Sequence, residues 1–237
     1  MQVEVDATGR GRGPWKTRKL LVTGIGAAYL AFLIVFAYLA GGADPFPGDL
    51  RVSLWLQSWR TPWLDAVMTG ISAIGYRPWA LPLVALTTAV LYITGRRKQS
   101  GLLLAVLLTT TVTVTVISNV VARPRPPDDL LQVFRYTGAF SFPSSHVMHA
   151  TVFLGTLTFT VAGSWKPGLA RRLVLASLVL ALAAMGASRL YLGAHWLSDV
   201  VGGYAFGAVL LAAAIGLWRR WMGRPDTSPT GPSDDTG

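Results

Sequence analysis

The chain of 237 residues is apolar and basic and contains no cysteine. Hydrophobic residues make up 52% of it and the mean hydropathy is +0.47, which favours several membrane crossings over two large soluble domains. The lack of cysteine excludes a disulfide framework and thiolate chemistry. The net charge of +10 is typical of a nucleic-acid-binding protein, but the positions of the charges argue against that class.

Long uncharged segments predict six transmembrane helices. The first follows a basic cluster and is longer than the apolar part of a cleaved signal peptide, so we expect it to remain as a span. The stretch TTTVTVTV alternates like a strand, but it lies inside a long uncharged segment, so a membrane helix is favoured there. The expected spans cover about 20–40, 78–94, 101–121, 146–162, 173–187 and 196–217.

The segments outside these spans are short. Residues 48–75 are rich in tryptophan, with a helix start at Thr61-Pro62, and predict one or two interfacial helices. The basic N-terminus, 1–19, and the tail, 219–237, flank a membrane domain at 20–218, and the composition of the tail predicts disorder. The fold class expected is therefore all-α, a polytopic membrane helix bundle.

The basic residues predict the orientation of this bundle. Six spans place both termini on one side, and 14 of the 21 lysines and arginines lie on that side: five before the first span and three each in 96–98, 166–172 and the tail. The positive-inside rule makes this side cytoplasmic, so topology explains most of the charge and a nucleic-acid partner is not expected. The remaining basic residues, expected on the outer face, are Arg51, Arg60, Arg77, Arg123, Arg125, Arg135 and Arg189.

Three polar segments reach the outer face at span ends: RPRP (123–126), FPSSH (142–146) and SRLYLGAHWLSD (188–199). All three histidines of the chain lie in or beside them. Each segment alone has a simple structural explanation: a loop that contacts lipid phosphates, a helix N-cap, or a helical pair between His195 and Asp199. Three such segments at one surface indicate a functional site.

These segments resemble the signature of the type 2 phosphatidic acid phosphatase family of membrane lipid phosphatases, which shares its site with vanadium haloperoxidases. The last part of that signature is Ser-Arg, five residues, His, three residues, Asp, and it is complete as Ser188-Arg189, His195 and Asp199. The middle part, Pro-Ser-Gly-His, is present as Pro143-Ser144-Ser145-His146, with serine in place of glycine. The first part, Lys, six residues, Arg-Pro, keeps Arg125-Pro126 but has Ser118 in place of lysine. The resemblance covers about residues 60–217.

The residue types suit cleavage of a phosphate ester. Such a reaction needs a nucleophile, a proton for the leaving oxygen and positive charge around the phosphoryl group. His195 is the expected nucleophile, forming a phosphohistidine; Asp199 fixes its tautomer, and His146 acts as acid and then base. The expected phosphate-binding residues are Arg125, Arg189, Ser144 and Ser145. No carboxylate or cysteine cluster has metal-ligand spacing, so we predict neither a metal nor another cofactor.

Two neighbouring features are less specific. His149, one turn after His146, is interpreted as a hydrogen-bonded histidine of the bundle, and Gly203 and Gly207 as a helix-packing motif. The missing lysine at Ser118 allows three explanations: compensation by Arg123 or Arg135, a substrate that needs less charge, or a slower enzyme.

The resemblance implies a membrane enzyme that hydrolyses a phosphate monoester or diphosphate of a lipid or polyprenyl carrier at the outer membrane face. Candidate substrates on that basis are polyprenyl diphosphate, phosphatidylglycerol phosphate, phosphatidic acid and a phosphorylated isoprenoid-sugar. A lipid phosphotransferase with the same phosphohistidine, or a non-catalytic lipid-binding or transport protein, are the alternatives. The sequence determines neither the choice among the lipids nor the oligomeric state.

Overall fold

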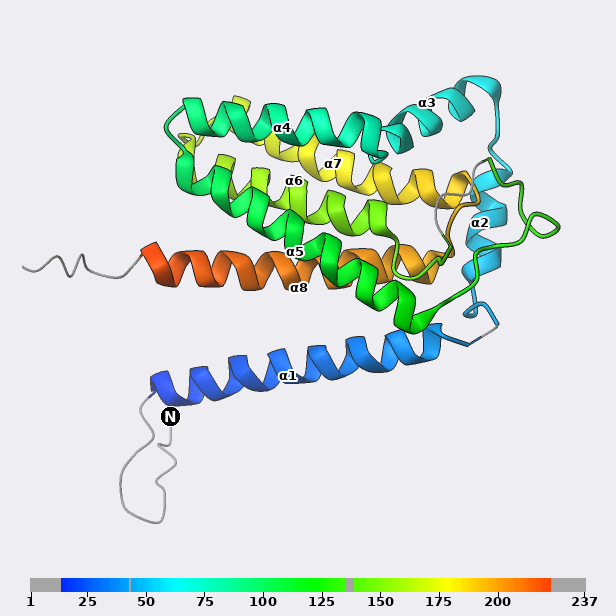
Figure 1. Ribbon diagram of the computed structural model, residues 1–237, viewed down its shortest axis with the longest axis horizontal. Helices are drawn as coiled ribbons and strands as arrows, with labels where there is room; N and C mark the ends of the chain where they lie inside the picture. The colour runs from blue at the N-terminus through cyan, green and yellow to red at the C-terminus, as the bar shows by residue number, and fades with distance from the viewer. Residues whose placement is uncertain (1–13, 43, 135–138, 223–237) are drawn as a thin grey trace, which may run out of the picture.

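The structure, a computed structural model, describes residues 14–42, 44–134 and 139–222. These residues form eight α-helices and no strand (Figure 1), so the expected all-α class is confirmed. The helices are α1 (Pro14–Ala40), α2 (Asp49–Gln57), α3 (Pro62–Ala73), α4 (Arg77–Ile93), α5 (Arg97–Val121), α6 (Ser145–Ser164), α7 (Leu169–Tyr191) and α8 (Leu197–Met222).

Five of these helices are long and apolar enough to cross a membrane: α1 from Leu20, α5, α6, α7 and α8 up to Arg220. The remaining expected span, 78–94, corresponds to one half of a bent pair of helices. Helix α4 is about 26 Å long, somewhat short for a bilayer core, and it continues α3 through a bend of 57° at Ile74–Tyr76. The bundle therefore has six spans when this bent pair is counted as one.

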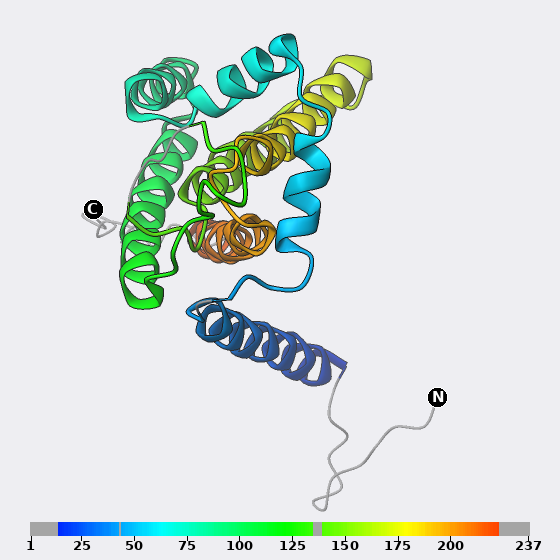
Figure 2. The same ribbon diagram turned by 90° about the vertical axis from the view of Figure 1, so that its right-hand side faces the viewer.

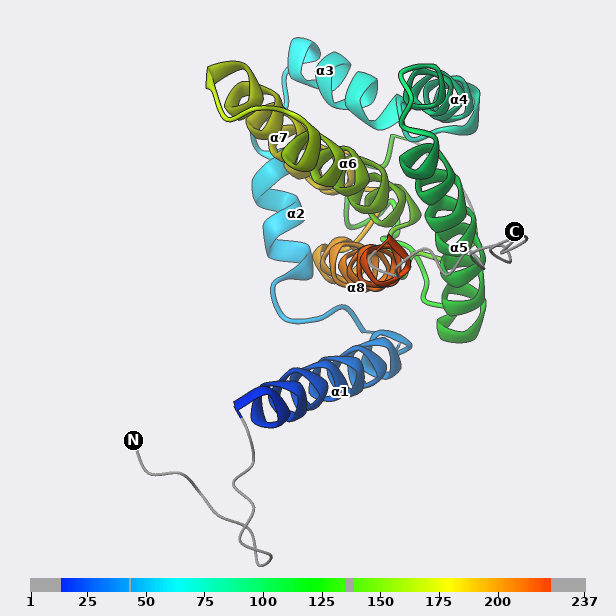
Figure 3. The same cartoon turned by 90° about the vertical axis from the view of Figure 1, so that its left-hand side faces the viewer.

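Helix α6 lies at the centre of the bundle and packs against α5, α7 and α8, whereas α1 lies at the edge and contacts chiefly α5 and α8 (Figures 2 and 3). Two glycines of α8 allow the close approach of α6. A Cβ at Gly203 would lie 2.9 Å from the Ser144 carbonyl oxygen, and one at Gly207 would lie 2.8 Å from the Thr151 Cβ. The geometry agrees with the interpretation of these glycines as a packing motif.

The two ends of the bundle differ in character. The start of α1, the end of α8, and the α4–α5 and α6–α7 turns all lie at one end, which we call the basic end (Figure 1). Its described basic residues outside α1 are Arg96, Arg97, Lys98, Lys166, Arg171, Arg172, Arg219 and Arg220. The other end, called the site end, carries α2, the segment between α5 and α6, and the turn between α7 and α8. Residues 1–13 and 223–237 lie outside the described residues, and with them most of the tail for which we predicted disorder; the first residues of that tail, 219–222, belong to α8.

Burial in this protein is the reverse of that in a soluble one. Apolar side chains along the helices are exposed, as at Leu108 and Leu180, which is expected where lipid replaces water. At the site end, by contrast, Arg123 and Arg189 are the largest fully buried side chains among the described residues. A buried charge is costly unless it is paired. The partners of Arg123 and Arg189 therefore indicate the function of this end of the bundle.

Candidate active site

His195 lies in the turn between α7 and α8, with its side chain almost completely buried. Its Nδ1 is 2.9 Å from the carbonyl oxygen of Ser141 and 3.5 Å from Oδ2 of Asp199. A carbonyl oxygen only accepts hydrogen bonds, so Nδ1 carries the proton in the neutral ring and Nε2 has the lone pair. The expected nucleophile is therefore held in the tautomer that exposes Nε2.

Burial keeps His195 neutral. It lowers the pKa of His195 from 6.5 to about 4, an effect that the hydrogen bond with Asp199 partly offsets and the charges of Arg189 and Arg125 reinforce. The imidazole is therefore unprotonated across the neutral pH range, as a nucleophile must be.

Arg125 lies directly beside Nε2 of His195. Its Nη1 is 3.3 Å from His195 Nε2 and donates to the Ala194 carbonyl at 2.7 Å, while Nη2 donates to the Phe140 carbonyl at 2.9 Å. The two carbonyls fix the guanidinium in front of the ring. A phosphoryl group attacked by Nε2 would be adjacent to this charge.

Arg189, in the last turn of α7, is anchored on one side only. Its Nη1 donates to the hydroxyls of Ser72 and Tyr76 from the α3–α4 pair. Within the described part of the chain, the buried Nε and Nη2 have no hydrogen-bond partner. Two unpaired guanidinium donors in a buried position match the forked geometry with which arginine binds phosphate oxygens.

His146 lies in the first turn of α6, and electrostatic interactions couple it to Arg189, His195 and Arg125. Its ring meets the Tyr76 ring edge-on at 4.7 Å between centroids, and a Cβ on Gly75 would overlap its Cδ2 atom. Among the described residues, His146 Nε2 and Ser144 Oγ are also buried without partners. Buried unpaired polar atoms are costly, and four of them around one cluster of cations indicate a site for an anion.

The start of α6 adds backbone donors. Ser144 is the N-cap, and its own N–H donates to the Asp199 carbonyl at 3.0 Å, which ties α6 to α8. Ser145 is the first residue of the helix. The N–H groups of a first turn have no partner within the helix and favour an anion, so both serines lie where phosphate binding was expected. The structure thus brings together all seven predicted site residues: His195, Asp199, His146, Arg125, Arg189, Ser144 and Ser145.

Arg123 does not share this arrangement. Its guanidinium donates to Asp199 Oδ1 at 2.6 Å and to Asp49 Oδ2 at 2.9 Å, and it is 1% exposed. This contradicts the hypothesis that Arg123 replaces the missing lysine at the phosphate. Ser118 donates its hydroxyl to the Phe142 carbonyl at 3.1 Å, and Arg135 lies outside the described residues.

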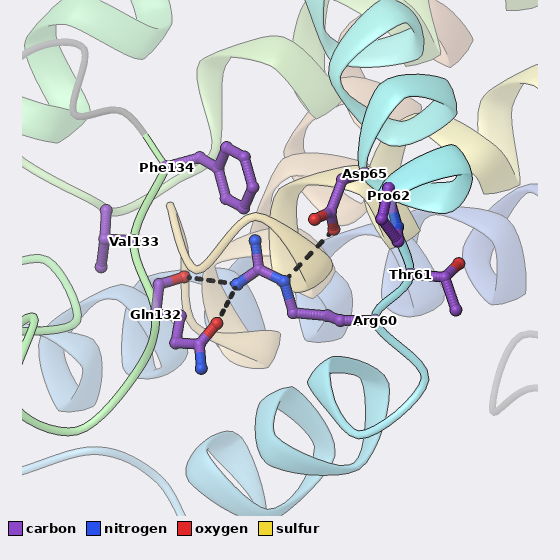
Figure 4. Close-up of a pocket in the computed structure, with 7 residues that line it drawn as sticks. All are labelled: Arg60, Thr61, Pro62, Asp65, Gln132, Val133 and Phe134. Atoms are coloured by element: carbon purple, nitrogen blue, oxygen red, sulfur yellow. Dashed lines mark hydrogen bonds and ion pairs between the residues drawn. The ribbon is translucent and has the colours of Figure 1, made fainter.

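Two other polar residues have structural partners. His149 bonds through Nδ1 to the Ser145 carbonyl at 2.8 Å and through Nε2 to the Thr111 hydroxyl at 3.0 Å, as expected of a bundle histidine. Arg60 lines a surface cavity of about 530 Å³, where it pairs with Asp65 at 3.2 Å and donates to Gln132 (Figure 4). The charge of Arg60 is compensated there, and none of the seven predicted site residues lines this cavity.

Sequence reasoning did not find Asp49, Ser141, Ser72 or Tyr76, which hold Arg123, His195 and Arg189. Asp49 and Tyr76 are far in sequence from the residues they contact, and no local spacing marks them. The sequence signal for Asp49 was its position in the tryptophan-rich segment, since a carboxylate beside the membrane needs a partner.

A buried histidine beside two arginines, at one end of a bundle of apolar helices, is the arrangement expected of a membrane-embedded phosphatase. Residues 99–222 match the PAP2 superfamily. The chain is 30% identical over 191 residues to phosphatidylglycerophosphatase B of Bacillus subtilis (strain 168), covering 80% of this chain and 92% of that protein.

Solved structures agree. A crystal structure of a transmembrane PAP2-type phosphatidylglycerolphosphate phosphatase from Bacillus subtilis aligns with a TM-score of 0.71 and 26% identity, over 82% of this chain and 96% of that one. Aquifex aeolicus LpxE aligns with a TM-score of 0.58 and 24% identity, over 72% and 96% of the two chains, and supports the fold. The chain belongs to the PAP2 superfamily and is a multi-pass, metal-independent membrane lipid phosphatase.

Proposed function

We propose that this enzyme hydrolyses its lipid phosphate through a phosphohistidine on His195. The observation that carries the proposal is the set of contacts of the ring: Ser141 and Asp199 both face Nδ1, which assigns the proton to Nδ1 and leaves Nε2, beside Arg125, with the lone pair. Attack of Nε2 on phosphorus forms the N–P bond and breaks the bond from phosphorus to the leaving oxygen. The Nδ1–H bonds to Ser141 and Asp199 stabilise the cation that develops on the ring.

The surrounding residues fit the remaining roles. Arg189 Nε and Nη2, with Arg125, bind the phosphoryl oxygens, and the start of α6 with Ser144 supplies further donors. His146 in its protonated form donates its proton to the leaving alcohol or phosphate, and then takes a proton from water. That water attacks phosphorus, breaks the N–P bond, and releases inorganic phosphate with neutral His195.

For the substrate we propose a glycerophospholipid that carries a terminal phosphate monoester, with phosphatidylglycerophosphate as the first compound to test. The support is the resemblance over most of the chain to phosphatidylglycerophosphatase B of Bacillus subtilis. A phosphate panel in detergent that contains phosphatidylglycerophosphate, phosphatidic acid and a polyprenyl diphosphate ranks the substrates by kcat/KM. Chelator in a parallel series should leave the rates unchanged, and vanadate should inhibit. Substrate consumption that depends on an added alcohol, with the phosphoryl group recovered on that alcohol and not as inorganic phosphate, would identify a phosphotransferase instead.

We further propose that the site end faces the outside of the cell. The support is the basic residues in the α4–α5 and α6–α7 turns and at the end of α8, all at the opposite end. The chain has no cysteine of its own, so single introduced cysteines report topology cleanly. Asp129→Cys should react with an impermeant thiol reagent in whole cells and Lys98→Cys should not; the reverse pattern would overturn the orientation.

The nucleophile is tested by trapping. A brief incubation with substrate labelled in the phosphate should leave acid-labile label on the wild type and none on His195→Ala, whose thermal unfolding reports that it is folded. His146→Ala should still acquire label from a substrate with a good leaving group, but turn over slowly. Label that persists without His195 would refute the phosphohistidine.

A further inference from the structure

Behind the nucleophile lies a buried chain of charges that runs from α2 to α8. Arg123 bridges two carboxylates, donating from Nη1 to Asp199 Oδ1 at 2.6 Å and from Nη2 to Asp49 Oδ2 at 2.9 Å. All three side chains are 1% exposed or less. The Phe46 and Trp196 rings face the guanidinium at 5.4 and 5.9 Å. This triad combines two carboxylates with one guanidinium, and all three groups are shielded from water.

Asp49 also fixes the start of the helix that carries Asp199. Its Oδ1 accepts the Ser198 N–H at 2.8 Å, and its Oδ2 accepts the Ser198 hydroxyl at 2.7 Å. Ser198 Oγ in turn accepts from Arg123 Nη1 at 2.6 Å. A carboxylate from another helix thus satisfies a first-turn N–H of α8, which the sequence of α8 leaves open.

The contact distances of Asp199 show which groups its carboxylate binds most closely. Arg123 holds Oδ1 at 2.6 Å and the Trp196 N–H holds Oδ2 at 2.9 Å, whereas His195 Nδ1 is 3.5 Å away. The strongest partner of Asp199 is therefore the arginine and not the histidine. An arginine in this position both orients the carboxylate and neutralises part of the charge that would attract a proton to His195.

We propose that Arg123 and Asp49 are positioning residues for the reaction. Arg123 orients the Asp199 carboxylate toward His195 and partly neutralises its negative charge, and Asp49 partly neutralises the positive charge of Arg123. The pair sets how readily His195 is protonated and how well it is aligned, without contact with phosphate. This inference rests on the proposed nucleophilic role of His195.

The charged and titratable groups that face His195 come from every side. Arg125 follows α5, Arg189 lies in the last turn of α7, and His146 and Asp199 lie in the first turns of α6 and α8. Arg123 and Asp49 stand behind Asp199 and act through it. Substitutions in the pair leave all of the phosphate-facing groups in place, so their effects can be separated from a loss of phosphate binding.

The test measures kcat/KM against pH for Arg123→Met, Asp49→Asn and the double variant. Removal of Arg123 frees the charge of Asp199, so the acid limb should move up by about one pH unit, and kcat should fall by about 10²-fold as the carboxylate loses its alignment. Asp49→Asn keeps an acceptor for Ser198 and leaves Asp199 as the charged partner of Arg123. The acid limb of this variant should therefore move to lower pH or stay at its wild-type position. The double variant removes one charge of each sign, and its acid limb should lie between those of Arg123→Met and the wild type.

A matched control is available at the same end of the bundle. Arg60→Met breaks an arginine–aspartate pair with Asp65, away from the His195 cluster, and should not move the acid limb. Because Arg123→Met leaves two buried carboxylates without their partner, it is the variant most prone to unfold; the double variant then carries the test. Arg123→Lys should recover part of the lost kcat.

Three results would overturn the proposal. One is a pH profile that stays at the wild-type position in every folded variant while only the melting temperature falls, since that describes a merely structural pair. Another is a shift of the same sign for Arg123→Met and Asp49→Asn, and the third is a rise in KM with kcat unchanged, which indicates phosphate contact. Failure of the nucleophile assignment is seen separately, in the trapping experiment on His195→Ala.

Discussion

His195 Nδ1 lies closer to the carbonyl oxygen of Ser141, at 2.9 Å, than to the carboxylate of Asp199, at 3.5 Å. The tautomer of His195, the proposed nucleophile, is therefore held by the backbone as well as by a side chain. In a Ser-His-Asp triad the carboxylate is the group that fixes the tautomer and stabilises the cation. In this protein the first task is shared with Ser141, and the Asp199 carboxylate is held mainly by Arg123.

This sharing predicts a partial effect for Asp199→Asn. With Ser141 still accepting the Nδ1 proton, we expect kcat to fall by about 10²- to 10³-fold, less than the roughly 10⁴-fold typical when a triad loses its only tautomer-fixing group. His195→Ala should abolish turnover. Steady-state rates of the two folded variants make the comparison, and equal losses would mean that the Ser141 contact fixes nothing.

The pH dependence follows from the low pKa of His195, about 4. The acid limb of kcat/KM, which reports the free enzyme, should lie near pH 4 and not near 6.5, because the ring stays neutral until then. Between pH 6.5 and 4 the unfolded chain binds a proton at His195 that the folded chain does not, so the free energy of unfolding should fall as pH falls through this window and then level off. His195→Gln should lose that slope in thermal unfolding. An acid limb near 6.5 in the wild type would contradict the burial argument.

Gly75 predicts a steric effect on His146. A Cβ at Gly75 would overlap the Cδ2 atom of His146, whose ring is fixed between this turn and the Tyr76 ring. Gly75→Ala should push the imidazole out of position and lower kcat by about 10²-fold, a typical cost of a displacement near 1 Å. Gly70→Ala is the matched control, since a Cβ there meets no atom within 4 Å among the described residues. If both variants keep full activity, His146 does not act from the position observed.

Ser118 allows a gain of function to be tested. It lies one turn before the end of α5 and bonds to the Phe142 carbonyl, just before the start of α6. A lysine there would add a charge-assisted partner for phosphate, and we expect Ser118→Lys to raise kcat/KM by about threefold to tenfold. The lysine should not rescue Arg123→Met, because the structure places Arg123 on two carboxylates and not on the phosphate side.

The control for this gain is Ser118→Met, which has similar length and no charge. Equal rates for the lysine and methionine variants would show that the charge plays no part. Rescue of Arg123→Met by Ser118→Lys would instead restore the compensation hypothesis.

Features that depend on local spacing follow from the amino-acid sequence alone. Uncharged segments of sufficient length predict helices in a bilayer, because the backbone there must satisfy its own hydrogen bonds. The four-residue spacing of His195 and Asp199 predicts that they lie close together, and the three motifs in their order predict the seven candidate site residues. The structure places Asp199 in the first turn of α8 and His195 in the turn before that helix. The helix boundaries are less accurate: α7 runs to Tyr191, beyond the expected 187, and so carries Arg189 within the helix.

Other roles depend on how separate helices rotate and slide against one another, and these are assigned by the packing of the bundle. Arg123 and Arg125 are two residues apart in one Arg-Pro repeat, and no periodicity distinguishes them. In the fold Arg125 faces His195, whereas Arg123 is buried against Asp49 and Asp199. Asp49 meets Ser198 across 149 positions of the chain, a contact that no local pattern encodes. A buried charge must find its partner wherever packing brings one, and that choice is made by the assembled bundle.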